Sequence, residues 1–176
     1  GDFTKSDLFF GSPMALALVH RGVGRWWRGR PGWRMDLDEA LALARNAHAT
    51  TRALTFAWAY GLGITGGVLR AEDRVLRDLE QALELAEAAS DDNAVGTVKY
   101  VLTTALAHRD SPRDRERRPA LLAEVRDMCL DRRFTLTELP LIELWIACDR
   151  AESGNLDSAL PMMRQCLEDL FRQGRY

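Results

Sequence analysis

The chain has 176 residues, the size of one ordinary domain, and its 47% hydrophobic content excludes intrinsic disorder. The net charge of −2 gives no global attraction to nucleic acid or to a membrane surface, so neither is expected as a partner. The three cysteines are widely spaced and form no CxxC pair. They favour neither a zinc site nor a disulfide framework, and they predict buried free thiols in a reducing, cytoplasmic compartment.

The first part of the chain predicts a leader followed by two helices. Residues 1–11 are expected to be a disordered or tag-derived leader, and residues 12–176 a helical-repeat domain cut from a longer protein. Ser12 and Pro13 have the residue types of a helix N-cap and first helical position, which predicts a helix over 13–27. Residues 28–35 are expected to form an extended loop before a second helix that starts near Asp36.

The middle of the chain predicts three more helices. The longest uncharged run, residues 53–69, approaches the length of a membrane span, but Gly66 and Gly67 break it. We therefore expect a buried core helix that begins near Thr50 or Thr51 and ends at these glycines. Helices over 71–89 and 94–108 should follow, with the second one capped by the acidic turn at residues 90–93.

The last third predicts a charged loop and three helices. Residues 109–118 are expected to form the loop, before a helix with its apolar stripe from Leu121 to Cys129. Thr135 with Glu138 three residues later is typical of a capping box, which predicts a helix to about residue 152. The turn Gly154–Asn155 precedes a final amphipathic helix that should end near Gly174.

A short motif of the type Leu-acid-x-Ala-Leu recurs at near-constant spacing. Its alanines are Ala40, Ala82 and Ala159, and a degenerate copy has Ala120, so the intervals are 42, 38 and 39 residues. Periods of this length are typical of helical-repeat proteins. Apolar helices alternate with amphipathic ones, and no stretch predicts a strand. The sequence therefore predicts an all-α fold, a TPR-like α-solenoid of four helical hairpins with eight helices, in which Ala40, Ala82 and Ala159 are buried at helix crossings.

The repeat resembles a tetratricopeptide repeat, with Gly154, Leu156, Ala159 and Met163 at the turn and second-helix positions and Ala147 at the small residue of the first helix. The period is about 40 residues rather than 34, and the usual closing proline is absent. Longer strings resemble the helical-repeat tails of large bacterial regulators: RGVGRWWRGRPGW (21–33), AHRD (107–110), RDMCL (126–130) and LFRQG (170–174).

The regulators that carry such tails combine a class III adenylate/guanylate cyclase domain or a helix-turn-helix domain with a signal-transduction ATPase. The resemblance covers nearly all of residues 12–176. It implies that the chemistry lies in other domains and that the tail is a sensor or a docking surface. No catalytic residue is carried over from it.

Several motifs allow a functional or a structural interpretation. Gly22-x-Gly24 and Gly61-x-Gly63 lie inside predicted helices, which favours close helix packing over a nucleotide loop. Residues 21–34 contain five arginines, three tryptophans and no acid, which is compatible with base or sugar stacking. The alternative, which we favour, packs Trp26 or Trp27 in the core and pairs the arginines with nearby acids. The three histidines have no metal-ligand or base partner at suitable spacing.

These patterns favour a non-catalytic regulatory or protein-interaction module, with no metal and no cofactor. The odd-numbered helices would line a concave groove that binds a protein segment or another domain of the same chain, and Arg25, Trp58 and Lys99 are the candidate groove residues. The alternative is a small-ligand sensor that uses the same groove to bind a sugar or nucleotide. The end of the chain should also leave an apolar patch near Trp145 and Phe171, through which two copies could form a two-fold dimer.

Overall fold

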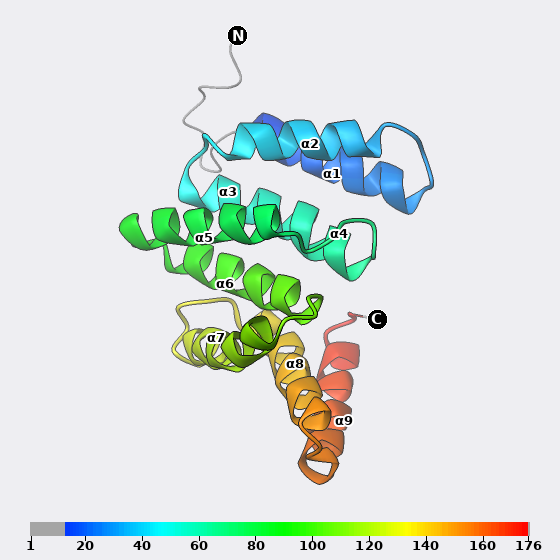
Figure 1. The fold of residues 1–176 in the computed structure, drawn as a ribbon, viewed down its shortest axis with the longest axis vertical. Coiled ribbons are helices and arrows are strands. Elements are labelled where there is room, and N and C mark those ends of the chain that lie inside the picture. The colour runs from blue at the N-terminus through cyan, green and yellow to red at the C-terminus, as the bar shows by residue number, and fades with distance from the viewer. Residues whose placement is uncertain (1–12, 176) are drawn as a thin grey trace. The chain divides into compact units, whose positions relative to one another are not determined.

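The computed structural model describes residues 13–175, and every regular element in this range is helical (Figure 1). Contacts divide the chain into two compact units, here called unit 1 (up to Arg109) and unit 2 (from Asp110). The predicted leader and the Ser12 cap lie outside the described residues. None of the described helices is both long enough and apolar enough to cross a bilayer.

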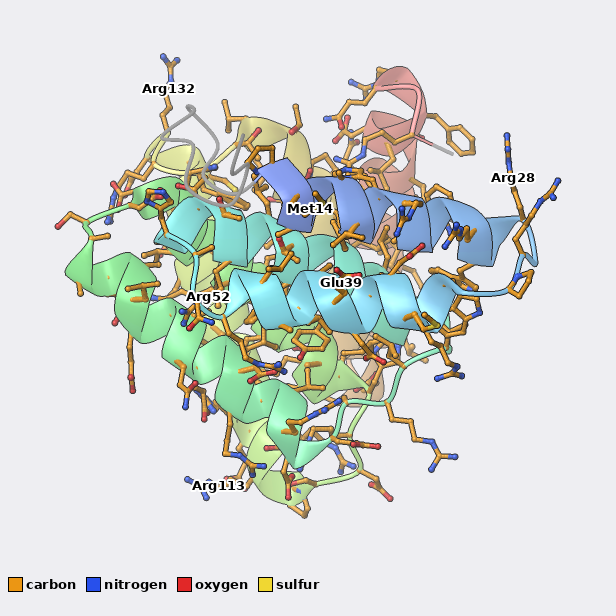
Figure 2. The ribbon with its side chains drawn as sticks, turned by 90° about the horizontal axis from the view of Figure 1, so that it is seen from above. Met14, Arg28, Glu39, Arg52, Arg113 and Arg132 are labelled. Atoms are coloured by element: carbon orange, nitrogen blue, oxygen red, sulfur yellow. The ribbon has the colours of Figure 1, made fainter. Side chains whose placement is uncertain are left out.

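Unit 1 begins with an antiparallel pair, α1 (Pro13–Trp27) and α2 (Trp33–Ala44), which lie side by side (Figure 1). The helices approach closely at Gly22, where an added Cβ would lie 2.8 Å from Cδ2 of Leu37. Arg28 extends outward from the turn between them (Figure 2). Gly32 adopts a φ of 84°, which glycine tolerates without strain, and α2 starts directly after it.

The predicted loop over residues 28–35 is confirmed for residues 28–32 and wrong for the rest, because α2 begins at Trp33 rather than near Asp36. Asp36 lies in the first turn of α2 and is only 3% exposed. Its carboxylate accepts hydrogen bonds from Arg21 at 2.7 Å and Arg25 at 2.8 Å, both on α1. The Arg21 hydrogen bond is the largest of several effects that together lower the pKa of Asp36. This buried acid joins the two helices, so its role is tertiary contact rather than helix initiation.

The predicted core helix is one continuous segment made of α3 (Ala49–Phe56), the π-helical turn η1 (Ala57–Gly61) and α4 (Leu62–Thr65). It ends at Gly66 and Gly67, as predicted. Of the glycines in the two Gly-x-Gly motifs, Gly22 and Gly63 meet a close neighbour, since an added Cβ at Gly63 would lie 2.7 Å from Leu69. Gly24 has no atom within 4 Å of such a Cβ. Close packing of helices is therefore confirmed for Gly22 and wrong for Gly24, whereas the neighbour of Gly63 lies in the segment after α4 and not on another helix.

An antiparallel pair completes unit 1: α5 (Asp73–Ala88) and α6 (Asp92–Ala107). The predicted acidic cap is confirmed, since the Asp91 carboxylate accepts a hydrogen bond from the Ala94 amide at 3.0 Å. Ser90, just before it, has a φ of 52°, so the chain reverses within this short turn.

Unit 2 begins with α7 (Pro112–Leu130), so the predicted charged loop over residues 109–118 is wrong for most of its length. Ser111 caps this helix by accepting a hydrogen bond from the Asp114 amide at 3.3 Å, and Pro112 takes the first helical position. The helix continues through Pro119. Arg118 is buried and pairs with Asp149 and, at 2.9 Å, with Glu152 of the following helix.

Unit 2 continues with the 3₁₀ turn η2 (Leu136–Glu138), α8 (Leu139–Glu152) and α9 (Leu156–Arg172), and α8 packs along α9 (Figure 1). The predicted capping box is wrong, because the Thr135 hydroxyl pairs with the Thr137 hydroxyl at 2.8 Å and α8 starts only at Leu139. The predicted final stop is confirmed: Gly174 follows α9 with a φ of 71°.

The repeat alanines differ in burial. Ala40, Ala82 and Ala159 are buried, as predicted, but Ala120 is exposed. The degenerate copy is therefore not equivalent to the others, since α7 turns Arg118 rather than Ala120 into the interior. Each of the two units is described by itself, and neither contains all four hairpins. The stacking of four hairpins into one array therefore stays a prediction.

The three cysteines are free thiols, and all of them belong to unit 2. Cys129 and Cys166 are buried, as predicted, and burial raises the pKa of each thiol to about 11. Cys148 is half-buried, and burial again raises its thiol pKa. All three thiols are therefore protonated near neutral pH while unit 2 stays folded, and a protonated thiol is a poor nucleophile.

The burial of Ala159 generates a stability prediction. Ala159→Leu should overpack the contact between α8 and α9 and lower the free energy of unfolding by about 1–3 kcal/mol. Ala120→Leu is the matched control, because Ala120 is exposed on α7 and the larger side chain has room there. Chemical denaturation of both variants measures the difference. Equal stability of the two variants would contradict the burial of Ala159 at a tight crossing.

Candidate functional site

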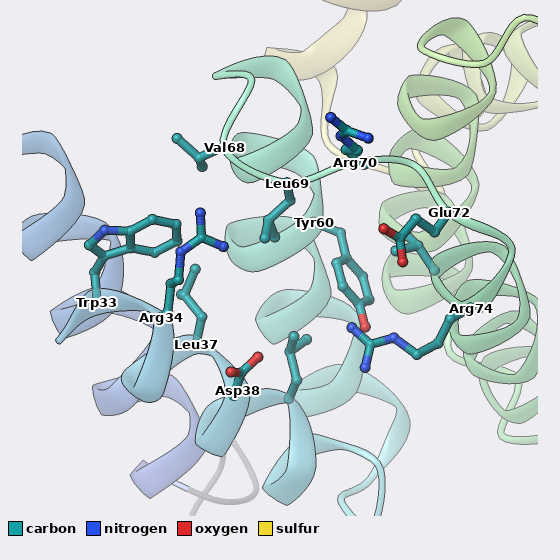
Figure 3. Close-up of a pocket in the computed structure, with 12 residues that line it drawn as sticks. Trp33, Arg34, Leu37, Asp38, Tyr60, Val68, Leu69, Arg70, Glu72 and Arg74 are labelled. Atoms are coloured by element: carbon teal, nitrogen blue, oxygen red, sulfur yellow. The ribbon is translucent and has the colours of Figure 1, made fainter.

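A cavity of about 410 Å³ lies within unit 1 between α2, η1, the segment after α4 and the start of α5 (Figure 3). Its lining combines aromatic, aliphatic and charged side chains: Trp33, Arg34, Leu37, Asp38, Leu41, Tyr60, Val68, Leu69, Arg70, Glu72, Arg74 and Val75. The volume is within the range typical of pockets that hold small ligands or single side chains of a partner.

Tyr60 is the buried aromatic side chain of the cavity, and the π-helical turn η1 carries it. A π turn inserts one residue relative to an α-helix and thereby rotates the side chains that follow; such turns are frequent at functional sites. The Tyr60 hydroxyl donates a hydrogen bond to Asp78 on α5 at 2.5 Å. Burial is the largest of the effects that raise the pKa of Tyr60, so the phenol stays protonated and keeps its role as a donor.

Asp78 does not line the cavity, and its carboxylate accepts hydrogen bonds from two side chains. Besides Tyr60, the Arg45 guanidinium binds it through two nitrogens, at 2.8 Å and 3.3 Å. Burial by itself would raise the pKa of Asp78, but the hydrogen bonds from Arg45 and Tyr60 and the charges of Arg45 and Arg74 outweigh it and lower the pKa. Asp78 is therefore a stable carboxylate that fixes Tyr60 in place.

The rim of the cavity carries five charged side chains. Arg34 stacks over the Trp33 ring, with 4.3 Å between the guanidinium carbon and the ring centroid. Arg34, Arg70 and Arg74 are exposed, as are the acids Asp38 and Glu72. Within the described residues none of these three arginines forms an ion pair, so all three guanidiniums can meet an incoming anion. Figure 3 shows them arising from different sides of the cavity.

The lining contains the carboxylates of Asp38 and Glu72 but few other side chains that take part in covalent chemistry. It contains no histidine, cysteine, serine or lysine, and its phenol already donates to Asp78. A nucleophile needs an adjacent base, and no such pair lines this cavity. Among residues 13–175, no group of three or more His, Cys, Asp and Glu side chains is arranged to hold a metal ion.

The three residues predicted for a groove lie elsewhere in unit 1. Arg25 on α1 pairs with Asp36. Trp58 in η1 packs on His20, with 4.6 Å between the ring centroids. Lys99 is half-buried on α6. None of the three lines the cavity, and their role in binding a partner stays a prediction.

The arginine- and tryptophan-rich segment is partly used for internal contacts. Arg21 and Arg25 bind Asp36, as the structural interpretation predicted. Trp26 is half-buried close to Gly66, where an added Cβ would collide with the Trp26 ring. Trp27, in contrast, is 65% exposed, so only one of the two adjacent tryptophans packs inward.

Sequence reasoning missed the cavity, although parts of its signal are present. Trp33 and Arg34 were predicted to lie in a loop, whereas they open α2. Arg70 and Glu72 follow the glycine pair that ends α4, and a polar segment after such a break is a signal for an exposed loop. The π turn that positions Tyr60 has no recognised sequence signature, and the Arg45–Asp78 contact joins residues 33 positions apart.

A second surface feature lies on unit 2. Along α9, four large apolar side chains are exposed: Leu156 (54%), Leu160 (50%), Leu167 (47%) and Phe171 (64%). Together with the half-buried Met163 they follow one face of the helix, and we call these five residues the α9 stripe. Phe171 agrees with the predicted apolar patch, whereas Trp145 is half-buried on α8.

Comparison of the chain with family models, with curated proteins and with solved structures finds no match in any of the three.

The Asp78 contacts generate a prediction about pH and stability. Because the pKa of Asp78 is lowered in the folded state, its carboxylate stabilises the fold above the unfolded pKa of about 3.9, and this contribution is lost as pH falls through the lower folded value. Asp78→Asn should therefore destabilise unit 1 near pH 7, and its difference from the unchanged chain should shrink in acid.

Chemical denaturation between neutral pH and about pH 3 measures this difference. Glu84→Gln, an exposed substitution on the same helix, is the control and should leave the pH dependence of stability unchanged. A deficit for Asp78→Asn that stays constant across the range would contradict the role given to the Asp78 carboxylate.

Proposed function

We propose that this chain is a non-catalytic binding module and that the unit 1 cavity is where it recognises its partner, a segment of protein. The observation that carries this proposal is a cavity of about 410 Å³ with aliphatic and aromatic residues in its lining, whose rim holds three arginines without ion pairs among the described residues. The aliphatic lining would receive an apolar side chain of the segment, and the guanidiniums would bind acidic groups beside it.

The charged side chains of the rim determine which kind of protein segment the cavity would bind. Arginine presents a planar fork of donors that matches a carboxylate, and such charge-assisted hydrogen bonds are stronger than neutral ones. The acids Asp38 and Glu72 oppose a purely acidic partner and favour one in which acidic groups stand at defined positions. An aromatic or aliphatic side chain flanked by acidic residues fits these requirements best.

A small ligand is the second candidate, and Trp33 is the observation that favours it. A tryptophan at the edge of a cavity can stack on a sugar or a nucleotide base, and guanidiniums bind phosphates as well as carboxylates. In this alternative the module senses a metabolite and changes the state of an attached domain.

We propose for the module the setting that the sequence resemblance implies. It would be a TPR-like repeat tail of a cytoplasmic signalling regulator, in which other domains perform nucleotide cyclisation, transcriptional control or ATP hydrolysis. Four hairpins stacked in one array would then form the module, and Arg25, Trp58 and Lys99 would contribute a further partner contact.

Thermal-shift and fluorescence titrations distinguish the two candidates. One arm uses a capped peptide, acetyl-Glu-Phe-Glu-amide, beside its neutral counterpart acetyl-Gln-Phe-Gln-amide, and the other arm uses a panel of sugars and nucleotides. We expect the acidic peptide to bind and to change the tryptophan fluorescence, because Trp33 lines the cavity, and the neutral peptide to bind about tenfold more weakly because it lacks the carboxylates.

The double substitution Arg70→Gln/Arg74→Gln should remove this preference for the acidic peptide. Because the Arg74 charge also favours the Asp78 carboxylate, a circular dichroism melt first establishes that the variant is folded. Arg77→Gln, an exposed substitution on α5 outside the cavity, should preserve the preference. Binding of a nucleotide or sugar alone would favour the sensor. If neither arm responds, or if the double variant binds as well as the unchanged chain, the cavity is not the recognition site.

A further inference from the structure

The α9 stripe has a spacing that matches one helix packing on another. Leu156, Leu160, Met163 and Leu167 are separated by four, three and four residues, which is the spacing of the core positions in a coiled coil. The opposite edge of this apolar face, formed by the buried residues Ala159, Cys166 and Leu170, already contacts the interior of unit 2. Since α8 is the helix packed along α9, the apolar face of α9 is wider than α8 covers.

Two charged residues flank the stripe on the same side, seven positions apart. Asp157 directly follows Leu156, and Arg164 directly follows Met163. Both charged residues therefore lie on the same flank of the α9 stripe, one heptad apart. Both side chains are exposed, and neither forms an ion pair within the described residues. A helix surface with an acid and a base one heptad apart on the same flank is complementary to itself when a second copy runs antiparallel.

We propose that the α9 stripe binds the α9 stripe of a second copy of this chain, as an antiparallel two-fold contact. In this register Leu156 packs on Leu167 of the other copy and Leu160 on its Met163. In this register Asp157 and Arg164 of the other copy are offset by two residues along the helix axis. At a rise of about 1.5 Å per residue, this offset is about 3 Å. The two-fold axis repeats each of these contacts, so two ion pairs border the apolar layer.

The charges discriminate between orientations. In a parallel two-fold arrangement the same flank of each copy lies on opposite sides of the apolar layer, so Asp157 and Arg164 of one copy would face neither of these residues in the other. A register in which Leu156 faces Phe171 would bring the two Arg164 side chains together at the axis. Glu168 lies farther from the stripe than Arg164, so Arg164 is the nearer partner of Asp157. The antiparallel register described above is the one that pairs unlike charges.

Sedimentation equilibrium of the whole chain over about a hundredfold concentration range tests the proposal. We expect the mass of the unchanged chain to rise towards that of a dimer. Leu160→Asp should weaken this association at least about tenfold, because it introduces a charge into the apolar layer. Leu130→Asp, which alters an exposed leucine of α7 instead, should leave the association unchanged.

A charge-reversal pair tests the register. Asp157→Arg alone leaves two arginines facing each other across the contact, and Arg164→Asp alone leaves two aspartates facing each other. Each variant should therefore associate at least about tenfold more weakly than the unchanged chain. An equimolar mixture of the two variants should recover the dimer, because every pair in the mixed species is again opposite in charge. Glu116→Lys, an exposed reversal on α7, is the control for net charge.

Circular dichroism melts of each variant establish that it is folded before its mass is measured. A chain that stays monomeric over the whole concentration range would overturn the proposal. This holds whether the α9 stripe is covered or binds another protein. So would a dimer that neither charge variant weakens, or two weakened variants that fail to recover when mixed, since both results exclude the proposed register.

Discussion

Unit 1 depends on the carboxylate of Asp78, which holds three helical segments together. It receives hydrogen bonds from Arg45, just after the end of α2, and from Tyr60 in the π-helical turn, while Asp78 itself belongs to α5. A charge taken out of water is costly unless it is paired and hydrogen-bonded, and here both conditions are met. The same contacts orient Tyr60 at the cavity, so the site and the fold share one constraint.

Two other shielded acids join helices in the same way. Asp36 joins α1 to α2 through two arginines, and Asp149 on α8 meets the buried Arg118 of α7. Burial raises the pKa of Asp149, whereas the two donors of Asp36 lower its pKa. Arginine suits these positions because its planar, permanently charged head can donate to two oxygens at once. The near absence of lysine from the chain, which has only Lys5 and Lys99, is consistent with this use of arginine.

The helices that sequence patterns located best are those whose ends carry local signals. The glycine pair after α4 and the Asp91 cap were predictable from residues close in sequence. The burial of Ala40, Ala82 and Ala159 was predictable from a short motif that recurs along the chain. Ser111 and Pro112 at the start of α7 carry the same cap signal as Ser12 and Pro13, but the many charges of residues 109–118 are also typical of a loop, so the two local signals conflict there.

The parts of the site that sequence could not reveal depend on distant residues. A threonine three positions before a glutamate caps a helix only where the surrounding structure allows it. In the segment between α7 and α8 the Thr135 hydroxyl hydrogen-bonds with the Thr137 hydroxyl instead. The cavity needs α2, η1 and α5 in contact, and nothing local predicts that Arg45 will meet Asp78. Composition and periodicity define the helices, whereas the long-range ion pairs decide which of their side chains meet.

The distribution of cysteines and tryptophans separates the two units spectroscopically and chemically. All three thiols belong to unit 2, whereas four of the five tryptophans, Trp26, Trp27, Trp33 and Trp58, belong to unit 1. A buried, protonated thiol reacts with an alkylating reagent only when the structure around it opens. The rate at which the two buried thiols, Cys129 and Cys166, are alkylated therefore reports the opening of unit 2, while most of the tryptophans report on unit 1, and both can be followed in one molecule.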